Sequence, residues 1–206
     1  VTEEVLLLSR WEAAKLYEKS LTKLIRSFSM QKCSKKILKY TGHSYEPYRV
    51  YLRPLRDKMR RTHRMIERHL VQKKPLNQKE LISSKEDILK PLRVVRESLE
   101  QSQNENIASG ELLDLMRRAK CFGINLARLD IRQESSRHTK LIAEIIKRKF
   151  KKDYNSWTEV EKINFLTKKI KEKNFIKSFK FKNKENLEVW STFKALSSQP
   201  KECLGA

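Results

Sequence analysis

The sequence predicts a mainly α-helical protein of about eight helices with a single β-strand at about residues 125–133. Apolar residues recur at helical spacing along most of the chain. Only four glycines and five prolines occur in 206 residues, which argues against a turn-rich β fold. The one segment with a clear alternation of apolar and charged residues is the exception that predicts the strand.

The first half of the chain predicts three helices. Thr2 can cap a helix that continues to about Phe28, because an oxygen-bearing side chain satisfies free amide groups at a helix start. A short helix over 34–40 is followed by Gly42, and a long helix is predicted over 46–73. Pro54 lies inside this long helix and is expected to kink or restart it. Residues 75–83 are predicted to be a polar connection.

The second half predicts more helices around the strand. Ser84 begins a helix to about Gln101 that should bend at Pro91, and a polar loop follows over 101–109. Further helices are predicted over 110–121, 135–149, 158–173 and 184–196. Gly123 is predicted to end the first of these helices. Thr158 and Glu161 have the spacing of a capping box, in which two side chains satisfy the first amides of a helix.

The predicted strand carries an unusual charge pattern. Arg128, Asp130 and Arg132 alternate with Ala127, Leu129 and Ile131 and so share one face, about 7 Å apart as same-face neighbours. Two guanidinium groups beside one carboxylate suit a fixed anion receptor better than a solvated edge. A lone strand cannot satisfy its own backbone groups. We therefore expect its partners to lie outside this chain and both chain ends to be cuts in a longer protein.

The net charge of +22 suggests a nucleic-acid binder, but the excess of basic residues is spread evenly along the chain. Every basic residue after Arg148 is a lysine, which favours a compositional bias over a binding surface.

Three distant cysteines form no zinc-like cluster and suggest a reduced, cytoplasmic setting. No apolar run is long enough to span a membrane, and no signal peptide is evident.

The stretch from Arg128 to Ser135 reads RLDIRQES, with Phe122-Gly123 before it and Arg137-His138-Thr139 after it. These residues resemble a conserved segment of the bacterial form of phosphoenolpyruvate carboxylase. Other matching segments occur in the family's order, and these are Leu6-Leu7-Leu8-Ser9-Arg10-Trp11, Glu46-Pro47-Tyr48-Arg49, Ile107-Ala108-Ser109-Gly110 and Tyr154-Asn155-Ser156-Trp157. The resemblance covers nearly the whole chain.

The resemblance implies an enzyme that joins phosphoenolpyruvate to bicarbonate to give oxaloacetate and phosphate, with Mg²⁺ or Mn²⁺. It implies a cytoplasmic, allosteric homotetramer whose β-barrel is embedded in helices. It assigns phosphoenolpyruvate binding to Arg132, with Arg128, Asp130 and Arg137 in support. Arg49 resembles an arginine that plant members use for sugar-phosphate activation, and helix-end packing is the alternative role.

Other family elements are missing from this sequence. It contains neither the His-Pro-Thr triplet that holds the catalytic histidine nor the Gly-Arg-Gly-Gly core of the phosphate loop. The metal ligands are likewise expected outside this chain. The sequence therefore predicts one partial domain over residues 1–206, without an internal linker, that lacks carboxylase activity alone and has weak independent stability.

Two alternatives of other classes stay open at this point. One is a basic helical module that binds nucleic acid, which a steep salt dependence of DNA binding would reveal. The other is a decayed paralogue that serves as a scaffold, against which the intact segment around Arg132 argues. The leading interpretation includes neither nucleic acid nor a membrane as a partner.

Overall fold

The computed structural model describes residues 2–29, 32–127, 132–172 and 179–200. Its contacts divide into unit 1, formed by residues 1–130 with 199–206, and unit 2, formed by residues 131–198. The predicted mainly helical class is confirmed, and the described residues form nine α-helices and two short 3₁₀ helices. The prediction that the whole chain belongs to one partial domain remains a prediction, and each unit is described by itself below.

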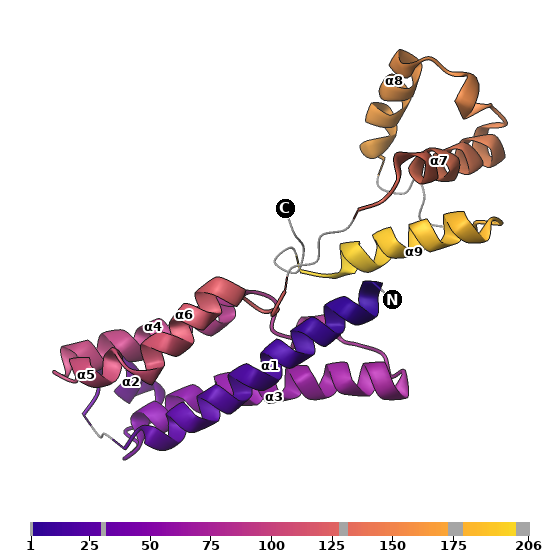
Figure 1. The fold of residues 1–206 in the computed structure, drawn as a ribbon. Helices are drawn as coiled ribbons and strands as arrows, with labels where there is room; N and C mark the ends of the chain where they lie inside the picture. The colour runs from indigo at the N-terminus through magenta and orange to yellow at the C-terminus, as the bar shows by residue number, and fades with distance from the viewer. Residues whose placement is uncertain (1, 30–31, 128–131, 173–178, 201–206) are drawn as a thin grey trace. The chain divides into compact units, whose positions relative to one another are not determined.

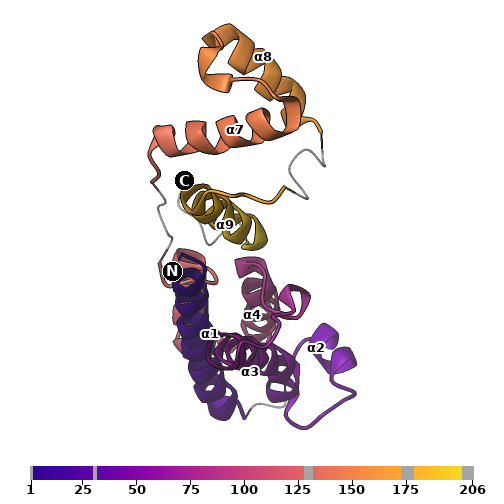
Figure 2. The same ribbon diagram turned by 90° about the vertical axis from the view of Figure 1, so that its right-hand side faces the viewer.

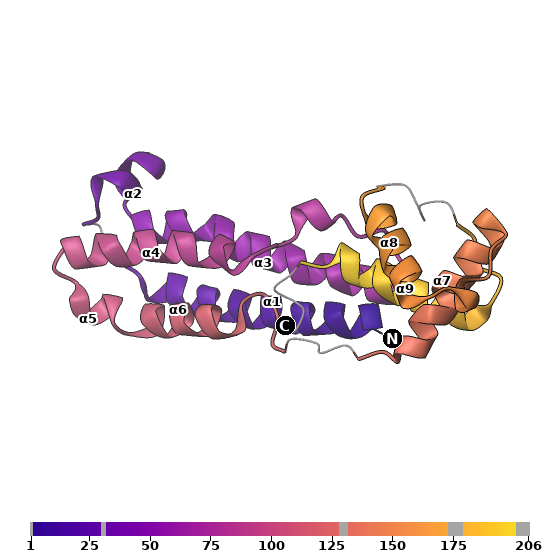
Figure 3. The same ribbon diagram turned by 90° about the horizontal axis from the view of Figure 1, so that it is seen from above.

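Unit 1 is built on two long helices that pack along their length. These helices, α1 (Thr2–Ser27) and α3 (Pro47–Gln72), lie side by side in Figures 1 and 3. The other elements of unit 1 are α2 (Lys35–Tyr40), η1 (Gln78–Glu80), α4 (Lys85–Gln101), α5 (Glu105–Ala108) and α6 (Glu111–Phe122). Helix α4 contacts α3 and α6, and Figure 2 shows α2 at the side of this group.

The core of unit 1 follows from the apolar faces of these helices. Leu7 of α1, Ile66 of α3 and Leu81 after η1 form a buried cluster. Near the other end of α1, Phe28 packs on Tyr48 with 5.5 Å between the ring centroids. The Tyr48 hydroxyl lies 2.9 Å from Ser98 Oγ, which satisfies its polar end inside the core.

Unit 2 is smaller and contains α7 (Ser135–Phe150), η2 (Tyr154–Ser156), α8 (Glu159–Ile170) and α9 (Lys184–Ser198). Helices α7 and α9 pack on each other (Figure 1) through Leu141, Ile145 and Val189. The Phe165 ring of α8 meets Trp157 edge to face, with 5.1 Å between the centroids. None of the described α8 residues is fully buried, so aromatic edges replace an aliphatic core around this helix.

Several predicted helix boundaries are confirmed by the capping contacts. The Ser84 side chain accepts a hydrogen bond from the Asp87 amide at the start of α4. Thr158 and Glu161 form the predicted capping box at the start of α8. Gly123 ends α6 with a φ of 63°, a backbone conformation that side-chain-bearing residues rarely adopt.

Neither Pro54 nor Pro91 restarts its helix, and the bends expected at these two positions remain predictions. Helix α3 continues through Pro54 and helix α4 continues through Pro91. A proline removes one helical hydrogen bond, but Leu52 and Leu55 on either side of Pro54 are buried. Tertiary packing therefore outweighs the local cost. The predicted polar loop over 101–109 also contains the short helix α5.

The strand predicted at about 125–133 is not found at its described ends. Residues 125–127 form bends and residues 132–133 have no regular structure, while 128–131 lie outside the described residues. No described residue belongs to a strand, so the described part of the chain offers no edge with which residues 125–127 could pair. Alternation of apolar and charged residues is compatible with a strand. A segment with this pattern forms a strand only where a second strand accepts and donates its backbone hydrogen bonds.

Candidate functional site

The structure describes the C-terminal residue, Arg132, of the predicted anion-binding segment Arg128–Arg132. Arg132 is exposed and lies in an irregular stretch that leads directly into α7. Arg128 and Asp130 lie outside the described residues. An exposed guanidinium near the start of a helix can meet an anion from solvent, and the helix start itself favours negative charge. The described geometry is therefore compatible with an anion site at Arg132.

Arg137, the predicted supporting residue, has a defined partner in unit 2. Its Nη2 lies 3.0 Å from Glu188 Oε2 of α9, and its Nη1 lies 3.4 Å from Gln133 Oε1. These contacts join the first turn of α7 to α9 and to the residue after Arg132. An ion pair of this exposure contributes at most about 1 kcal/mol, so its main effect is on orientation.

Arg49 is placed at the end of another helix. Its Nε and Nη2 each donate to main-chain oxygens of α1, to Ile25 O and Arg26 O, at 3.0 Å. Its Nη1 pairs with Glu46. A cation on the last carbonyl groups of a helix satisfies acceptors that have no partner in the helix and opposes its dipole. The geometry therefore favours helix-end packing for Arg49 over the regulatory role that the resemblance implied.

A short connection precedes the predicted anion segment and is attached to α1 at two points. The Tyr17 hydroxyl donates to Gly123 O at 2.8 Å. Eight residues earlier on α1, Ser9 Oγ lies 3.2 Å from the Ala127 amide nitrogen and 3.3 Å from the Ala127 oxygen. Burial raises the pKa of Tyr17 to about 12, so its hydroxyl remains a donor at neutral pH. The sequence reasoning did not assign these two residues to the site.

The signal that pointed toward Ser9 was the match of the Leu6–Trp11 segment to the family. No local pattern indicates Tyr17, because its partner lies 106 positions away. Between the two contacts, Ile124 and Asn125 are buried at 3% and 1% exposure. The connection is thus held by side-chain hydrogen bonds at its ends and by burial in its middle.

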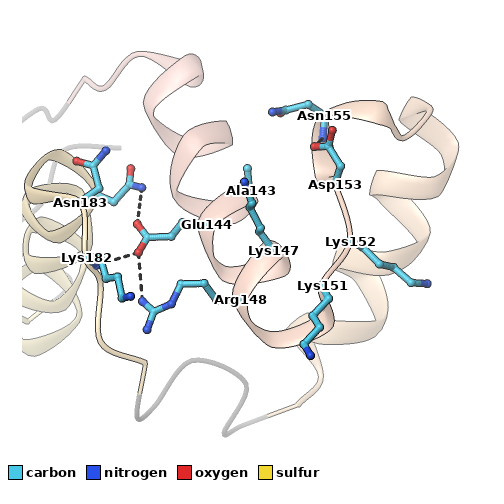
Figure 4. A pocket seen from close by; sticks show the side chains of 11 residues that line it. Ala143, Glu144, Lys147, Arg148, Lys151, Lys152, Asp153, Asn155, Lys182 and Asn183 are labelled. Carbon is cyan, nitrogen blue, oxygen red and sulfur yellow. Dashed lines mark hydrogen bonds and ion pairs between the residues drawn. The ribbon is translucent and has the colours of Figure 1, made fainter.

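Unit 2 contains a polar groove of about 900 Å³ beside α7. Figure 4 shows its lining, which comprises Ala143, Glu144, Lys147, Arg148, Lys151, Lys152, Asp153, Asn155, Lys182, Asn183 and Asn186. Glu144 receives hydrogen bonds from Asn186 Nδ2 at 2.8 Å, from the Lys182 amide at 2.8 Å and from Arg148 at 3.3 Å. This carboxylate therefore links α7 to the start of α9.

The same contacts set the charge state of Glu144. Burial alone would raise its pKa, but the hydrogen bonds from Asn186, from the Lys182 amide and from Arg148 together lower it below its ordinary value. Arg148 also donates to Lys180 O and stacks over Phe179, with 4.7 Å to the ring centroid. Because its central carboxylate and guanidinium are already engaged, the groove is a structural junction in unit 2.

Two further observations concern metal and membrane. No group of three or more His, Cys, Asp or Glu side chains converges within the described ranges, and the expectation that metal ligands lie outside this chain remains a prediction. Among the helices that the structure describes, none combines the length and apolarity needed to cross a lipid bilayer.

The fold and these contacts define a helical chain in which the connection over residues 123–127 is attached to α1. The family model of phosphoenolpyruvate carboxylase matches residues 1–206, and the chain belongs to that family. Relatives named phosphoenolpyruvate carboxylase include proteins from Vibrio vulnificus (strain CMCP6), 39% identical over 208 residues, and Aliivibrio salmonicida (strain LFI1238), 38% identical over 207 residues.

A third relative of the same name, from Acinetobacter baumannii (strain ATCC 17978), is 37% identical over 215 residues. In each of these three comparisons the match covers 100% of this chain but 24% of the relative. The chain therefore spans about a quarter of the length of the curated relatives that it matches.

Proposed function

We propose that this chain is a part of a phosphoenolpyruvate carboxylase and supplies one wall of its phosphoenolpyruvate site. The observation that carries the proposal is the family match along all 206 residues, which includes the intact segment from Arg128 to Ser135. The parent enzyme would join phosphoenolpyruvate to bicarbonate and release oxaloacetate and phosphate, a step of anaplerotic carbon fixation.

Arg132 is the proposed ligand of phosphoenolpyruvate. Phosphate and carboxylate groups present paired oxygens that match the planar fork of a guanidinium group. A fixed cation also stabilises the charge that develops when the phosphoryl group is transferred to form carboxyphosphate and the enolate. Arg128 and Asp130 would support Arg132, with the carboxylate offsetting the repulsion between the two arginines. Arg137 would support it by its contacts to Gln133 and α9.

The divalent cation of the parent enzyme, Mg²⁺ or Mn²⁺, would polarise the substrate oxygens when bound. The resemblance implies that its ligands lie in polypeptide outside this chain, and we propose that they do. The parent protein is proposed to be a cytoplasmic, allosteric homotetramer, with neither nucleic acid nor a membrane as a partner. The 206-residue chain by itself is proposed to be inactive.

The test is an assay of oxaloacetate formation with two samples. One is the full polypeptide encoded by the reading frame that contains this chain, and the other is the purified 206-residue chain. The full polypeptide should convert phosphoenolpyruvate and bicarbonate to oxaloacetate in the presence of Mg²⁺ or Mn²⁺, and the isolated chain should not. A full polypeptide that is folded but inactive with either metal contradicts the proposed function, and an active isolated chain contradicts the division of the site.

A further inference from the structure

The groove of unit 2 has more positive than negative charge in its lining. Five of its lining residues are basic and two are acidic, which gives a net charge of +3. Both carboxylates are already engaged by neighbouring donors. Glu144 accepts hydrogen bonds from Asn186 and Arg148. Asp153 Oδ1 accepts one from the Asn155 amide at 3.0 Å. The junction around Glu144 therefore leaves an excess of cations in the groove.

Three lysines account for this excess. Arg148 is engaged by Glu144, and the Lys152 side chain extends away from Lys147 in Figure 4. The other basic residues of the lining make no ion pair within the described part of the chain, and these are Lys147, Lys151 and Lys182. Their ammonium groups line one hollow and lack a local carboxylate.

The general excess of lysine in the sequence does not by itself produce such an arrangement. On α8, Lys162 lies 2.9 Å from Glu159, so its charge is balanced on the same helix. On α9, Lys194 is exposed and lies outside the groove lining. Cations that line a single hollow repel one another, and an anion bound among them relieves this repulsion. The groove therefore favours an anionic occupant.

The main chain fixes the base of each of these lysines. Lys147 lies within α7, and the Lys151 amide donates to Lys147 O at 3.1 Å where the helix ends. The Lys182 amide donates to Glu144 Oε1 at 2.8 Å. Figure 4 shows Lys147 between the Glu144 contacts on one side and Lys151 on the other. The three ammonium groups thus extend from fixed backbone positions on two segments of unit 2.

Lys151 keeps its side chain at a backbone cost. It ends α7 with a φ of 53°, in the left-handed region where glycine is the usual residue. A cation at this position also opposes the helix dipole, which is an alternative reason for its presence. That electrostatic role is already served in the last turn by Lys147, Arg148 and Lys149. The Lys151 ammonium group is therefore available for a ligand.

The size and the polar groups of the groove indicate the class of ligand. Its volume of about 900 Å³ lies within the range of small-molecule sites. Asn155 and Asn183 also line it, and their side-chain amides can donate hydrogen bonds to a ligand oxygen. An ammonium group is a compact charge that binds phosphate oxygens from many directions. Three such groups suit a ligand that carries more than one phosphate.

We propose that the groove of unit 2 binds a small molecule with two or more phosphate groups, with Lys147, Lys151 and Lys182 as its ligands. Glu144 and Arg148 hold the wall of the site and do not contact the ligand. All of these residues belong to unit 2. This site is separate from Arg132 and does not depend on the proposed carboxylase function.

The experiment uses pyrophosphate as the probe and the full polypeptide that contains this chain, without divalent cations. Brief acetylation followed by mass spectrometry measures the reaction rate of each lysine separately. At a pyrophosphate concentration ten times its Kd, acetylation of Lys147, Lys151 and Lys182 should slow about ten-fold, because only the unoccupied site reacts. Lys194 should react at an unchanged rate, and inorganic phosphate should protect the groove lysines only at higher concentrations.

A pair of variants tests whether the charge of Lys151 contributes to binding. In Lys151→Gln, protection of Lys147 and Lys182 should require about three-fold to ten-fold more pyrophosphate, since one charged contact is lost. Lys194→Gln is the matched control, because it removes the same charge from an exposed position of unit 2 outside the groove. It should leave the protection of the groove lysines unchanged.

The site is overturned if pyrophosphate at concentrations up to about 10 mM leaves the groove lysines unprotected, or if it protects Lys194 equally. Equal shifts in Lys151→Gln and Lys194→Gln would also overturn it. Groove lysines that are already unreactive without pyrophosphate would show that other polypeptide covers the groove, which contradicts a ligand site. Equal protection by inorganic phosphate would contradict the need for two phosphate groups. Stronger protection by single-stranded DNA would assign the groove to nucleic acid instead.

Discussion

Unit 1 encloses aliphatic side chains between long helices, whereas unit 2 surrounds a small apolar cluster with aromatic edges and a hydrogen-bonded carboxylate. Only five of the buried apolar residues that the structure describes lie in unit 2, and these are Leu141, Ile145, Ile146, Tyr154 and Val189. On α8, Val160, Ile163 and Ile170 are between 60% and 83% exposed. The comparison indicates that unit 1 depends mainly on hydrophobic burial and that unit 2 depends more on a few polar junctions.

The difference also bears on independent stability. A small cluster removes less apolar surface from water and so contributes less free energy, at roughly 25 cal/mol per Å². Exposed apolar side chains on a helix are the feature that we expected of a chain with weak independent stability. Whether the isolated chain is weakly stable remains a prediction, and the following substitutions test how the two units differ.

The largest effect should come from the core of unit 1. Ile66→Ala removes a side chain with 0% exposure from the cluster with Leu7 and Leu81, and it should lower the free energy of unfolding of unit 1 by about 2–5 kcal/mol. Val71→Ala, at a position on the same helix that is 76% exposed, should change it by less than about 0.5 kcal/mol. Urea unfolding followed by residue-resolved NMR measures both, and similar losses in the two variants would contradict the account of the core.

A smaller effect is expected at the polar junction of unit 2. Glu144→Gln replaces a carboxylate that accepts hydrogen bonds from Asn186, the Lys182 amide and Arg148, and it should cost about 1–3 kcal/mol. Glu185→Gln serves as the control, because that exposed carboxyl lies on the same end of α9 and makes no side-chain contact of this kind. Hydrogen exchange in α7 and α9 should rise in the first variant alone. Equal exchange rates in the two variants would show that Glu144 does not stabilise the packing of α7 on α9.

The pH dependence of unit 2 should follow from the same carboxyl group. Its pKa is lowered in the folded state, so its contribution to stability is present above the unfolded value of about 4.3 and is lost as the pH falls through the lower folded value. The exchange protection of α7 should therefore be constant from about pH 6 to about pH 4.5 and decline below that range. Glu144→Gln should flatten this decline, and an unaltered acid profile in the variant would assign the decline to other groups.

A local effect is expected at the start of α8. Thr158→Ala removes the capping box with Glu161 and should destabilise α8 by about 1 kcal/mol, with little change in unit 1. The control is Thr167→Ala, since Thr167 lies exposed within the same helix and alanine favours helix formation there. Circular dichroism and exchange rates in α8 separate the two variants. If Thr167→Ala were the more damaging change, the cap would not be what stabilises this helix.

The parts of the fold that the sequence predicted are those that depend on local signals. Thr158 with Glu161, Ser84 and Gly123 mark helix ends by their own chemistry, and the structure confirms them. Helix α3 does not restart at Pro54, because the local cost of the proline is opposed by the burial of Leu52 and Leu55 in the same helix. The strand was predicted from alternation alone, which does not report whether a partner strand is available.

The candidate site was predictable only in part for a similar reason. Arg132 stands in a short segment that can be recognised within one stretch of sequence. The contacts of Ser9 with Ala127 join residues 118 positions apart, and those of Glu144 with Asn186 join residues 42 positions apart. No local pattern encodes such pairs, because the folded backbone brings them together.

The central claim is that Arg132 binds phosphoenolpyruvate, and its most direct test is the kinetics of Arg132→Lys in the full polypeptide. The lysine keeps the charge but loses the planar fork, so kcat/KM for phosphoenolpyruvate should fall by about 100-fold or more. Arg117→Lys, at an exposed arginine of α6 that pairs with Asp114 of the same helix, should leave kcat/KM unchanged. An Arg132→Lys enzyme with the kcat/KM of the unmutated protein would contradict the account.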